Sequence, residues 1–342
     1  HCKHTYRRQP FGLALSPDGN SALVANVGVY DYALVQGATP ANADSMMINR
    51  HPYGDNTREA KEGVVYDGKT IPAVGDPNAP EAMSVYVIDL QTNTTRYRVK
   101  TGLLIGEMVE DAEVVGGASP NSIVVGREYA YVTNATNDNI AILDYRTGKL
   151  KGKMPITVDK RIDRLRGLLP FGLCMTKDEK TIYTALLGFN AIAVIDVATQ
   201  KTKGLIPAGW GPARVLLNKE ENELYAISCR GYGAGPNGGR DFTRPVQGTY
   251  VGDIQLATFQ KVKVPDAAVL AAYTKTCITN TFKEVKVSAA LSNPLPVVPG
   301  ASKSPIRHIV FVTKENRTYD EVFGQLQQAR GDNTLARFGT GV

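Results

Sequence analysis

The side chains with the clearest chemical potential lie near the end of the chain, where Glu315, Asn316 and Arg317 follow an apolar run at residues 306–312. The run lacks a clean alternation, which predicts a strand covered on both faces in a parallel sheet. In open α/β sheets, chemistry gathers at the carboxyl ends of such strands. A carboxylate beside an amide oxygen suits a hard metal ion, and an arginine suits phosphate. Glu315 and Asn316 are therefore candidate metal ligands, and Arg317 is a candidate phosphate-binding residue.

The segments before it repeat one order of strands and turns. PFGLALSPDGNSALVANVG begins at Pro10 and PFGLCMTKDEKTIYTALLG begins at Pro170, and related copies begin at Ser119 and Gly211. Each copy reads as a Pro-led apolar strand, a polar turn, a second strand, a small-residue turn and a third strand that ends in Asp. The period is roughly 40 to 50 residues, as expected for stacked repeats. The copies are centred near Ala22, Tyr131, Tyr183 and Tyr225.

A four-stranded antiparallel unit of this kind buries its faces only against neighbouring units, so the units must stack radially as blades. We therefore predict an all-β fold of four-stranded blades, in which the outer strands alternate with charge. Asp89, Asp144 and Asp196 close the third strands. Because one active site rarely needs the same residue in every repeat, we expect these carboxylates to bind backbone N–H groups of the next turn.

YAYVTNATNDNIAILD, at residues 129–144, resembles the YVTN-type β-propeller repeat. The resemblance implies a propeller, commonly of about seven blades, within the four to eight that propellers have. Only four repeats are recognisable, so either other blades have diverged or blades precede His1 in the parent chain. The resemblance says almost nothing about function, since propellers serve binding, assembly and catalysis alike.

Two insertions interrupt the repeats, at about residues 33–82 and 230–247. Loops of this length inside a compact domain tend to be functional. Both leave from strand ends, so we expect them to converge on one propeller face. The second insertion is glycine-rich but lacks the Lys-Ser or Lys-Thr ending of a phosphate-binding loop. Trp210, between two glycines, is predicted to pack between blades, with an exposed anchor for a partner as the alternative.

Charge and cysteine content exclude several classes of protein. The net charge of +6 is spread along the chain, and the basic stretch at residues 160–166 alternates with Asp159 and Asp163, which predicts a solvated loop or short helix face. Nucleic acid is not an expected partner. No run reaches the ~18 apolar residues of a membrane span, so no transmembrane segment is predicted. No signal peptide is visible in the given chain.

The cysteines show no CxxC or zinc-type spacing. Cys174 and Cys229 lie in apolar strand-like runs and are predicted to be small buried thiols. The sequence leaves the disulfide state of all four cysteines open. They are Cys2, Cys174, Cys229 and Cys277.

The pattern changes after residue 266. Residues 267–303 predict a helix and a proline-rich linker, and residues 304–342 predict the start of another, α/β domain. ENRTYDEVFG, at residues 315–324, resembles the end of the first strand in phosphoesterases of the alkaline-phosphatase superfamily, the phospholipase C-like branch. By that resemblance, Glu315 and Asn316 would help to hold a catalytic divalent metal ion. The order of propeller, linker and motif also resembles bacterial proteins that fuse YVTN repeats to such a domain.

These resemblances imply the scaffold or binding portion of a periplasmic or extracellular, metal-dependent phosphoesterase. The given chain lacks a nucleophile and most metal ligands, so we expect neither turnover nor a bound metal from this chain alone. Its expected partner is the missing C-terminal phosphoesterase portion or another protein.

Two alternatives remain. One is a non-catalytic propeller that mediates surface or protein–protein contacts. The other is an enzyme with its site in the central channel. The second would require a cluster of histidines or carboxylates there, which only four histidines make hard to assemble.

Overall fold

The computed structural model describes residues 9–28, 57–66, 68–71, 73, 75–231, 256–282, 306–312, 317–326 and 331–336 of the chain. The chain divides into two compact units, residues 1–283 and residues 284–342. The prediction of Glu315 and Asn316 as metal ligands falls outside the described residues, as does Cys2.

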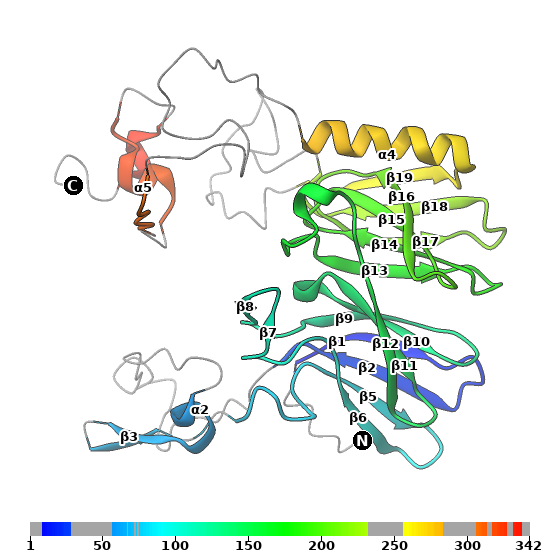
Figure 1. Ribbon diagram of the computed structural model, residues 1–342, viewed down its shortest axis with the longest axis horizontal. Helices are drawn as coiled ribbons and strands as arrows, with labels where there is room; N and C mark the ends of the chain where they lie inside the picture. Colours follow the sequence, from blue (N-terminus) through cyan, green and yellow to red (C-terminus); the bar gives the residue numbers. More distant parts are fainter. Residues whose placement is uncertain are drawn as a thin grey trace. The chain divides into compact units, whose positions relative to one another are not determined.

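The first unit is built from four antiparallel sheets, which we call blades 1 to 4 (Figure 1). Blade 1 consists of β1 (Pro10–Leu15), β2 (Ser21–Asn26), β5 (Ser84–Asp89) and β6 (Thr94–Lys100). Blade 2 consists of β9 (Pro120–Val125), β10 (Ala130–Asn134), β11 (Asn139–Asp144) and β12 (Lys149–Pro155). Blade 3 consists of β13 (Pro170–Met175), β14 (Thr181–Leu186), β15 (Ala191–Asp196) and β16 (Lys201–Pro207). Blade 4 has β17 (Pro212–Leu217), β18 (Glu223–Ser228) and β19 (Thr258–Lys263).

The blades follow one another in a propeller arrangement. Their first strands contact in the order β1, β9, β13, β17, so these are the inner strands. One buried cluster lies between each pair of neighbouring blades. Tyr131 and Ile140 of blade 2 share a cluster with Leu173 and Ile182 of blade 3, for example. The predicted all-β propeller of repeated blades is confirmed, and the four recognised repeats are the four blades.

Close approach of the inner strands explains the glycine of the repeated Pro-Phe-Gly. A Cβ atom at Gly172 would lie 2.6 Å from the carbonyl oxygen of Ala213 and 2.8 Å from the Cα atom of Arg214, on the inner strand of the next blade. Gly12 stands in the same way against the backbone of Asn121. A larger residue at either position would push two blades apart, because interiors of this density have no spare volume.

The repeated aspartates bind the turns that follow the third strands, as predicted. Asp89 Oδ1 accepts hydrogen bonds from the backbone N–H groups of Gln91 (2.9 Å) and Thr92 (3.0 Å). Asp196 Oδ1 accepts one from the N–H of Thr199 at 2.8 Å, and Asp144 makes the equivalent contacts in its blade. The bond from the Thr92 N–H lowers the pKa of Asp89 below its ordinary value. These carboxylates are therefore structural.

The two faces of the propeller differ. One face of the propeller consists of tight turns, and we call it the turn face. There the first strand of each blade joins the second, and the third strand joins the fourth. The opposite loop face carries the connections from β2 to β5 and from β18 to β19, and those between blades. The connections of the loop face contain α2 (Arg58–Glu62), β3 (Val64–Tyr66), β4 (Lys69–Ile71), β7 (Met108–Val109) and β8 (Ala112–Glu113). Both insertions leave from the ends of second strands and so start on this one face. The prediction that they converge there falls largely outside the described residues.

Helix α4 (Ala267–Thr281) packs on β16 and belongs to the first unit (Figure 1). It begins at Asp266, whose Oδ1 accepts a hydrogen bond from the Val269 N–H at 2.9 Å. Leu270 and Cys277 are its buried residues, and burial raises the pKa of the Cys277 thiol to about 11. The sequence predicted this helix correctly but grouped it with the linker.

The described part of the second unit holds α5 (Tyr319–Phe323) and the 3-10 turn η4 (Asn333–Leu335). Thr318 caps α5 and forms a capping box with Glu321. Residues 306–312 form no strand, contrary to prediction, and the side chains of Ile309, Val310 and Phe311 are 84%, 87% and 88% exposed. The physical reason is that no strand among the described residues pairs with this segment.

Candidate functional site

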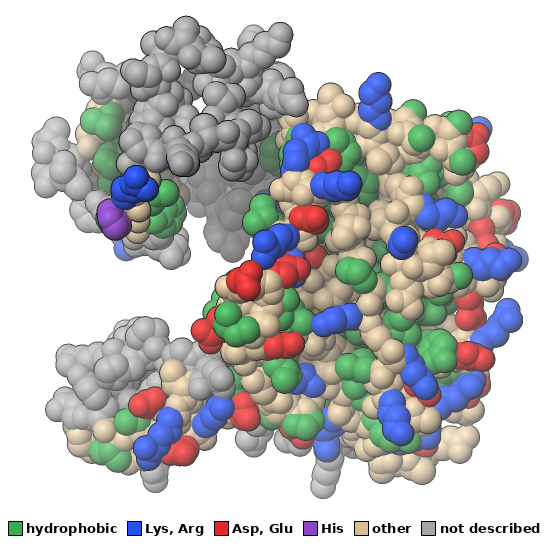
Figure 2. Space-filling model, in the orientation of Figure 1, with side chains coloured by type: hydrophobic (Ala, Val, Ile, Leu, Met, Phe, Trp, Pro, Cys, Tyr) green, Lys and Arg blue, Asp and Glu red, His purple; other side chains and the backbone are tan. Residues whose placement is uncertain are grey.

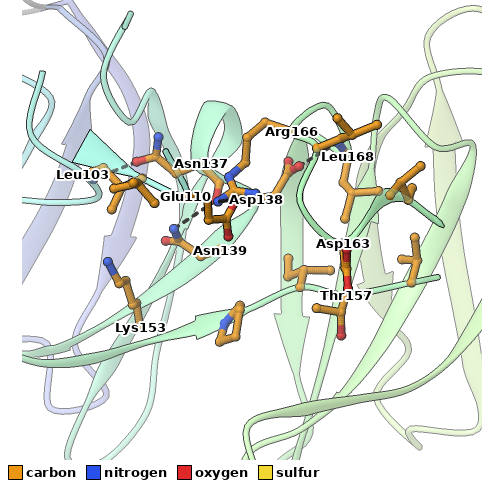
Figure 3. Close-up of a pocket in the computed structure, with 16 residues that line it drawn as sticks. Leu103, Glu110, Asn137, Asp138, Asn139, Lys153, Thr157, Asp163, Arg166 and Leu168 are labelled. Atoms are coloured by element: carbon orange, nitrogen blue, oxygen red, sulfur yellow. Dashed lines mark hydrogen bonds and ion pairs between the residues drawn. The ribbon is translucent and has the colours of Figure 1, made fainter. Parts of the chain in front are cut away.

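One cavity in the described part of the chain opens on the loop face, beside blade 2 (Figure 3). Its volume is about 390 Å³. The walls come from the β7–β8 hairpin, the 3-10 turn η1 (Ala135–Asn137), the end of β12 and the β12–β13 connection, which contains the 3-10 turn η2 (Lys160–Ile162). A second depression of about 250 Å³ shares Leu103, Glu110 and Arg166 with it, and we call the two together the groove.

Asp138 shapes one wall of this groove. It is 5% exposed, and its φ of 49° is the left-handed conformation that Asp tolerates better than most residues. Its carboxylate accepts three backbone N–H bonds, from Gly167 (2.8 Å), Leu168 (3.1 Å) and Leu169 (2.9 Å). With its oxygens so occupied, Asp138 is a positioning residue for the β12–β13 connection and not a chemical base.

A buried amide network supports the same wall. The Asn137 side chain accepts a hydrogen bond from the Leu103 N–H at 2.8 Å and donates one to the carbonyl of Gly117 at 3.2 Å. Asn134 donates to Asn139 Oδ1 at 2.8 Å. Asn137 thus ties blade 2 to the segment that arrives from blade 1, and the Asn134–Asn139 bond lies within blade 2.

Ion pairs hold the β7–β8 hairpin against the β12–β13 connection. Arg166 pairs with Glu110 at 3.1 Å, and Arg164 pairs with Asp111 at 3.4 Å. Figure 2 shows acidic and basic side chains side by side along this edge of the first unit. The basic stretch at residues 160–166 is thus the predicted solvated loop with a short helical turn, and its charges bind neighbouring acidic residues.

Two charged side chains in the lining of this cavity are available to a ligand. Lys153 and Asp163 line it, and neither makes an ion pair among the described residues. Thr157 and Asn139 line it too (Figure 3). The lining also includes the apolar Ile156 and Val158. Opposite charges, a hydroxyl and an amide around apolar walls suit the binding of a small polar molecule. The lining contains no histidine or cysteine.

The sequence-predicted site residues lie elsewhere. Arg317 is exposed just before α5, and Glu315 and Asn316 lie outside the described residues. Within the described residues, no three His, Cys, Asp or Glu side chains lie close enough together to hold a metal ion. No described helix is long and apolar enough to cross a membrane.

Two predictions about single residues were wrong. Cys229 is exposed because it follows the last residue of β18, whereas Cys174 is largely covered, and burial raises the pKa of its thiol to about 12. Trp210 is 48% exposed because it sits in the β16–β17 connection on the loop face, and not between blades. The described cysteines, Cys174, Cys229 and Cys277, are free thiols.

Sequence reasoning missed the groove. Its signal was present in the TNATNDN run, where four polar side chains follow a buried strand without a glycine or proline to explain a simple turn. Polar side chains concentrated at the end of one repeat, and absent from the others, indicate a local role for that blade.

Comparison with known proteins adds little beyond architecture. No protein-family model and no curated protein sequence matches the chain. Solved structures that it resembles include Kuenenia stuttgartiensis hydrazine synthase, with 19% identity over 65% of this chain and 42% of that one and a TM-score of 0.38. The β-propeller domain of Myceliophteria thermophila Cps50 (Swd1) follows at 11% identity, 65% and 49% coverage and a TM-score of 0.39. Streptogramin B lyase matches at 12% identity, 68% and 56% coverage and a TM-score of 0.36.

The chain spans about half the length of these structures. The fold itself is a β-propeller. At these identities the likenesses carry no information on activity.

Proposed function

We propose that this chain is the propeller scaffold and binding portion of a secreted or periplasmic, metal-dependent phosphoesterase, and that its loop face is the binding surface. The observation that carries the phosphoesterase part is the run ENRTYDEVFG at residues 315–324. Its second half folds as the capped helix α5. The separation of the chain into two units supports a division of labour between binding and chemistry.

The residues of this chain would contribute only part of such a site. Glu315 and Asn316 would supply two oxygen ligands, and Arg317 would contact a phosphoryl oxygen. A divalent metal ion supplies Lewis-acid polarisation of the phosphoryl group when it is bound. The described residues do not form a metal site by themselves, so the remaining ligands would come from other parts of the protein.

The binding part of the proposal rests on the asymmetry of the two propeller faces. Aspartate-pinned turns close one face, whereas the groove and the strand ends from which both insertions leave lie on the other. In scaffolds of this kind, loops on a rigid framework carry recognition. Lys153 is the uncommitted cation of the groove, which makes a phosphate group a suitable ligand there.

The test of the phosphoesterase activity compares this chain with a longer natural protein that contains it. Hydrolysis of p-nitrophenyl phosphate and bis(p-nitrophenyl) phosphate is measured with added Mg²⁺, Mn²⁺, Zn²⁺ or Ca²⁺. We expect metal-dependent hydrolysis by the longer protein only. Glu315→Gln should lower kcat/KM by about a hundredfold or more, as the loss of a major electrostatic contribution does, while the exposed Glu62→Gln control keeps the wild-type rate. A longer protein without activity under every metal would refute the proposal.

The binding function is tested separately by titrating this chain with inorganic phosphate in a calorimeter. Lys153→Ala should weaken binding, and Asp163→Asn in the same pocket should leave it equal or tighter. An equal effect of both substitutions, or no binding to the wild-type chain, would remove the anion site from the proposal.

The second candidate function is a non-catalytic propeller that binds another protein. The exposed Trp210 on the loop face favours it, because tryptophan is enriched among residues that anchor interfaces. A longer protein that binds no metal and hydrolyses no phosphoester would favour this function.

A further inference from the structure

The turn of the β7–β8 hairpin places two carboxylates against two arginines on the wall of the groove. Glu110 Oε2 pairs with Arg166 Nη2 at 3.1 Å (Figure 3), and Asp111 Oδ2 pairs with Arg164 Nη2 at 3.4 Å. The Arg164 side chain also donates a hydrogen bond to the backbone carbonyl of Glu110 at 3.1 Å. Arginine is the side chain best suited to bind the oxygens of a carboxylate or a phosphate group. Here the chain's own carboxylates hold that place.

The composition of this turn indicates that its side chains matter as well as its backbone. Val109 pairs with Ala112, which leaves Glu110 and Asp111 as a two-residue turn. Their φ angles are 53° and 64°, and turns with positive φ at both positions usually contain Asn-Gly or Asp-Gly. Glutamate adopts this conformation rarely. The turn therefore keeps two acidic side chains against the backbone preference, at the point where the arginines lie.

The two arginines stand on a fixed part of the chain. Gly167, directly after Arg166, donates its N–H to the buried Asp138 carboxylate at 2.8 Å, and the next two backbone N–H groups also bind this carboxylate. The backbone that carries Arg166 is thus held in place. We therefore expect the hairpin, rather than the arginines, to move when these contacts open.

The hairpin itself is weakly held and has a glycine at each end. Its strands are two residues long, and an isolated hairpin is at best marginally stable. Gly106 and Gly116 flank it with φ angles of 86° and 79°, and a Cβ atom at Gly116 would meet nothing within 4 Å. The paired side chains of Arg164 and Asp111 are 65% and 98% exposed, and ion pairs so exposed contribute little to stability. A competing anion can therefore displace the hairpin at small cost.

We propose that Arg164 and Arg166 form a binding site for a molecule with a phosphate group, and that Glu110 and Asp111 occupy this site until such a ligand displaces them. The phosphate oxygens would take over the N–H donors that the two carboxylates now use. The hairpin would then leave the wall of the groove, with Gly106 and Gly116 as its hinges.

Displacement of the hairpin would also enlarge the space for the ligand. Val109 and Glu110 line both depressions of the groove, so their departure would join the two. Arg166 lines the same cavity as Lys153, and the site thus extends the anion site proposed above. The inference rests on the anion-binding part of the proposed function and is independent of the phosphoesterase activity.

Titration with inorganic phosphate in a calorimeter tests the site, at a constant low ionic strength because salt screens exposed charges. Glu110→Gln should lower the Kd about two- to fivefold, the factor that corresponds to one exposed ion pair. Glu113→Gln is the matched control, because Glu113 lines the second depression on the same hairpin without an ion pair among the described residues. It removes the same charge and should leave the Kd unchanged. Arg166→Gln should raise the Kd at least about tenfold.

Hydrogen exchange measures the displacement of the hairpin. The N–H groups of Gly106 and Val114 form backbone hydrogen bonds at the base of the hairpin, each at 2.9 Å. Phosphate should accelerate exchange at these amides in the wild-type chain more than sodium chloride of equal ionic strength does. The amides of residues 167–169 should stay protected in both salts, because Asp138 binds them. Circular dichroism verifies that each variant folds, which is expected because the changed side chains lie at the surface.

The outcomes separate this inference from the proposed function. Equal Kd values for Glu110→Gln and Glu113→Gln would overturn the inference, and so would unchanged exchange of the hairpin in saturating phosphate. Either result would leave the proposed anion site in place if Lys153→Ala still weakens binding. Binding that depends on Arg166 and not on Lys153 would support the inference and contradict the role proposed for Lys153. No phosphate binding by any of these proteins would overturn both.

Discussion

Replacing Asp138 with Asn tests whether one carboxylate holds the wall of the groove. The substitution keeps the shape of the side chain and the left-handed backbone, which Asn adopts readily. It removes the negative charge that accepts three N–H bonds, from Gly167, Leu168 and Leu169. The amide oxygen can still accept one or two of these bonds, but its NH2 group then faces a donor.

The magnitude follows from these contacts. Hydrogen bonds to charged groups contribute about 1.5–3 kcal/mol each, and an unsatisfied buried donor costs about 1–3 kcal/mol. We therefore expect Asp138→Asn to lower the free energy of unfolding by about 2–4 kcal/mol. Asp163→Asn is the matched control, because this carboxylate lines the same pocket without an ion-pair partner, and it should change stability by less than about 0.5 kcal/mol.

Urea unfolding followed by circular dichroism measures both variants, and hydrogen exchange of peptides covering residues 163–169 locates the effect. Exchange there should accelerate in Asp138→Asn before global unfolding. Equal stability of the two variants, or unchanged exchange at the three amides, would refute the argument that Asp138 positions this connection.

Three further outcomes are expected. Gly172→Ala should destabilise the protein by about 1–3 kcal/mol, since the new methyl group meets the neighbouring inner strand, whereas Gly152→Ala, which meets nothing within 4 Å, should be nearly neutral in the same urea titration. Cys229 should react with a thiol reagent at pH 8 in the folded protein, and Cys174, with its thiol pKa of about 12, only after unfolding, as mass mapping would show. The hydrogen bond from the Arg161 side chain lowers the pKa of Asp159 from 3.8 to about 2. The contribution of this bond to the free energy of unfolding is therefore complete above pH 4 and is lost as the pH falls towards 2.

Each of these expectations has a contrary result. Equal urea midpoints for both glycine variants would contradict the close approach of the blades. Rapid labelling of both Cys229 and Cys174 in the folded protein would contradict the burial of Cys174. Asp159→Asn should remove part of the decrease in stability between pH 4 and pH 2. An unchanged dependence of stability on pH would contradict the contact between Asp159 and Arg161.

The sequence predicted the blades well because the fold is local and repeated. Each strand, turn and third-strand aspartate is specified within about 40 to 50 residues, and the copies reinforce one another. The turn role of Asp89 and the helix after residue 266 could be predicted for the same reason, since each depends on its own neighbours. The predicted strand at residues 306–312 fails because a strand needs a partner, and pairing is not a property of the segment itself.

The groove could not be predicted because it is assembled from distant parts of the chain. Glu110 meets Arg166 across more than fifty residues, and Asp138 meets Gly167 across 29. Nothing in either local sequence specifies that meeting. The exposure of Trp210 has a similar origin, because it depends on where a connection leaves a blade and not on the residues that flank it.

The asymmetry between the turn face and the loop face also determines how this protein can change over evolutionary time or in the laboratory. Every loop-face connection starts and ends at neighbouring strands, so its length can grow without shifting the register of a blade. The aspartate-pinned turns have no such freedom. New recognition elements can therefore be grafted one connection at a time onto the loop face, while the turn face preserves the spacing of the blades.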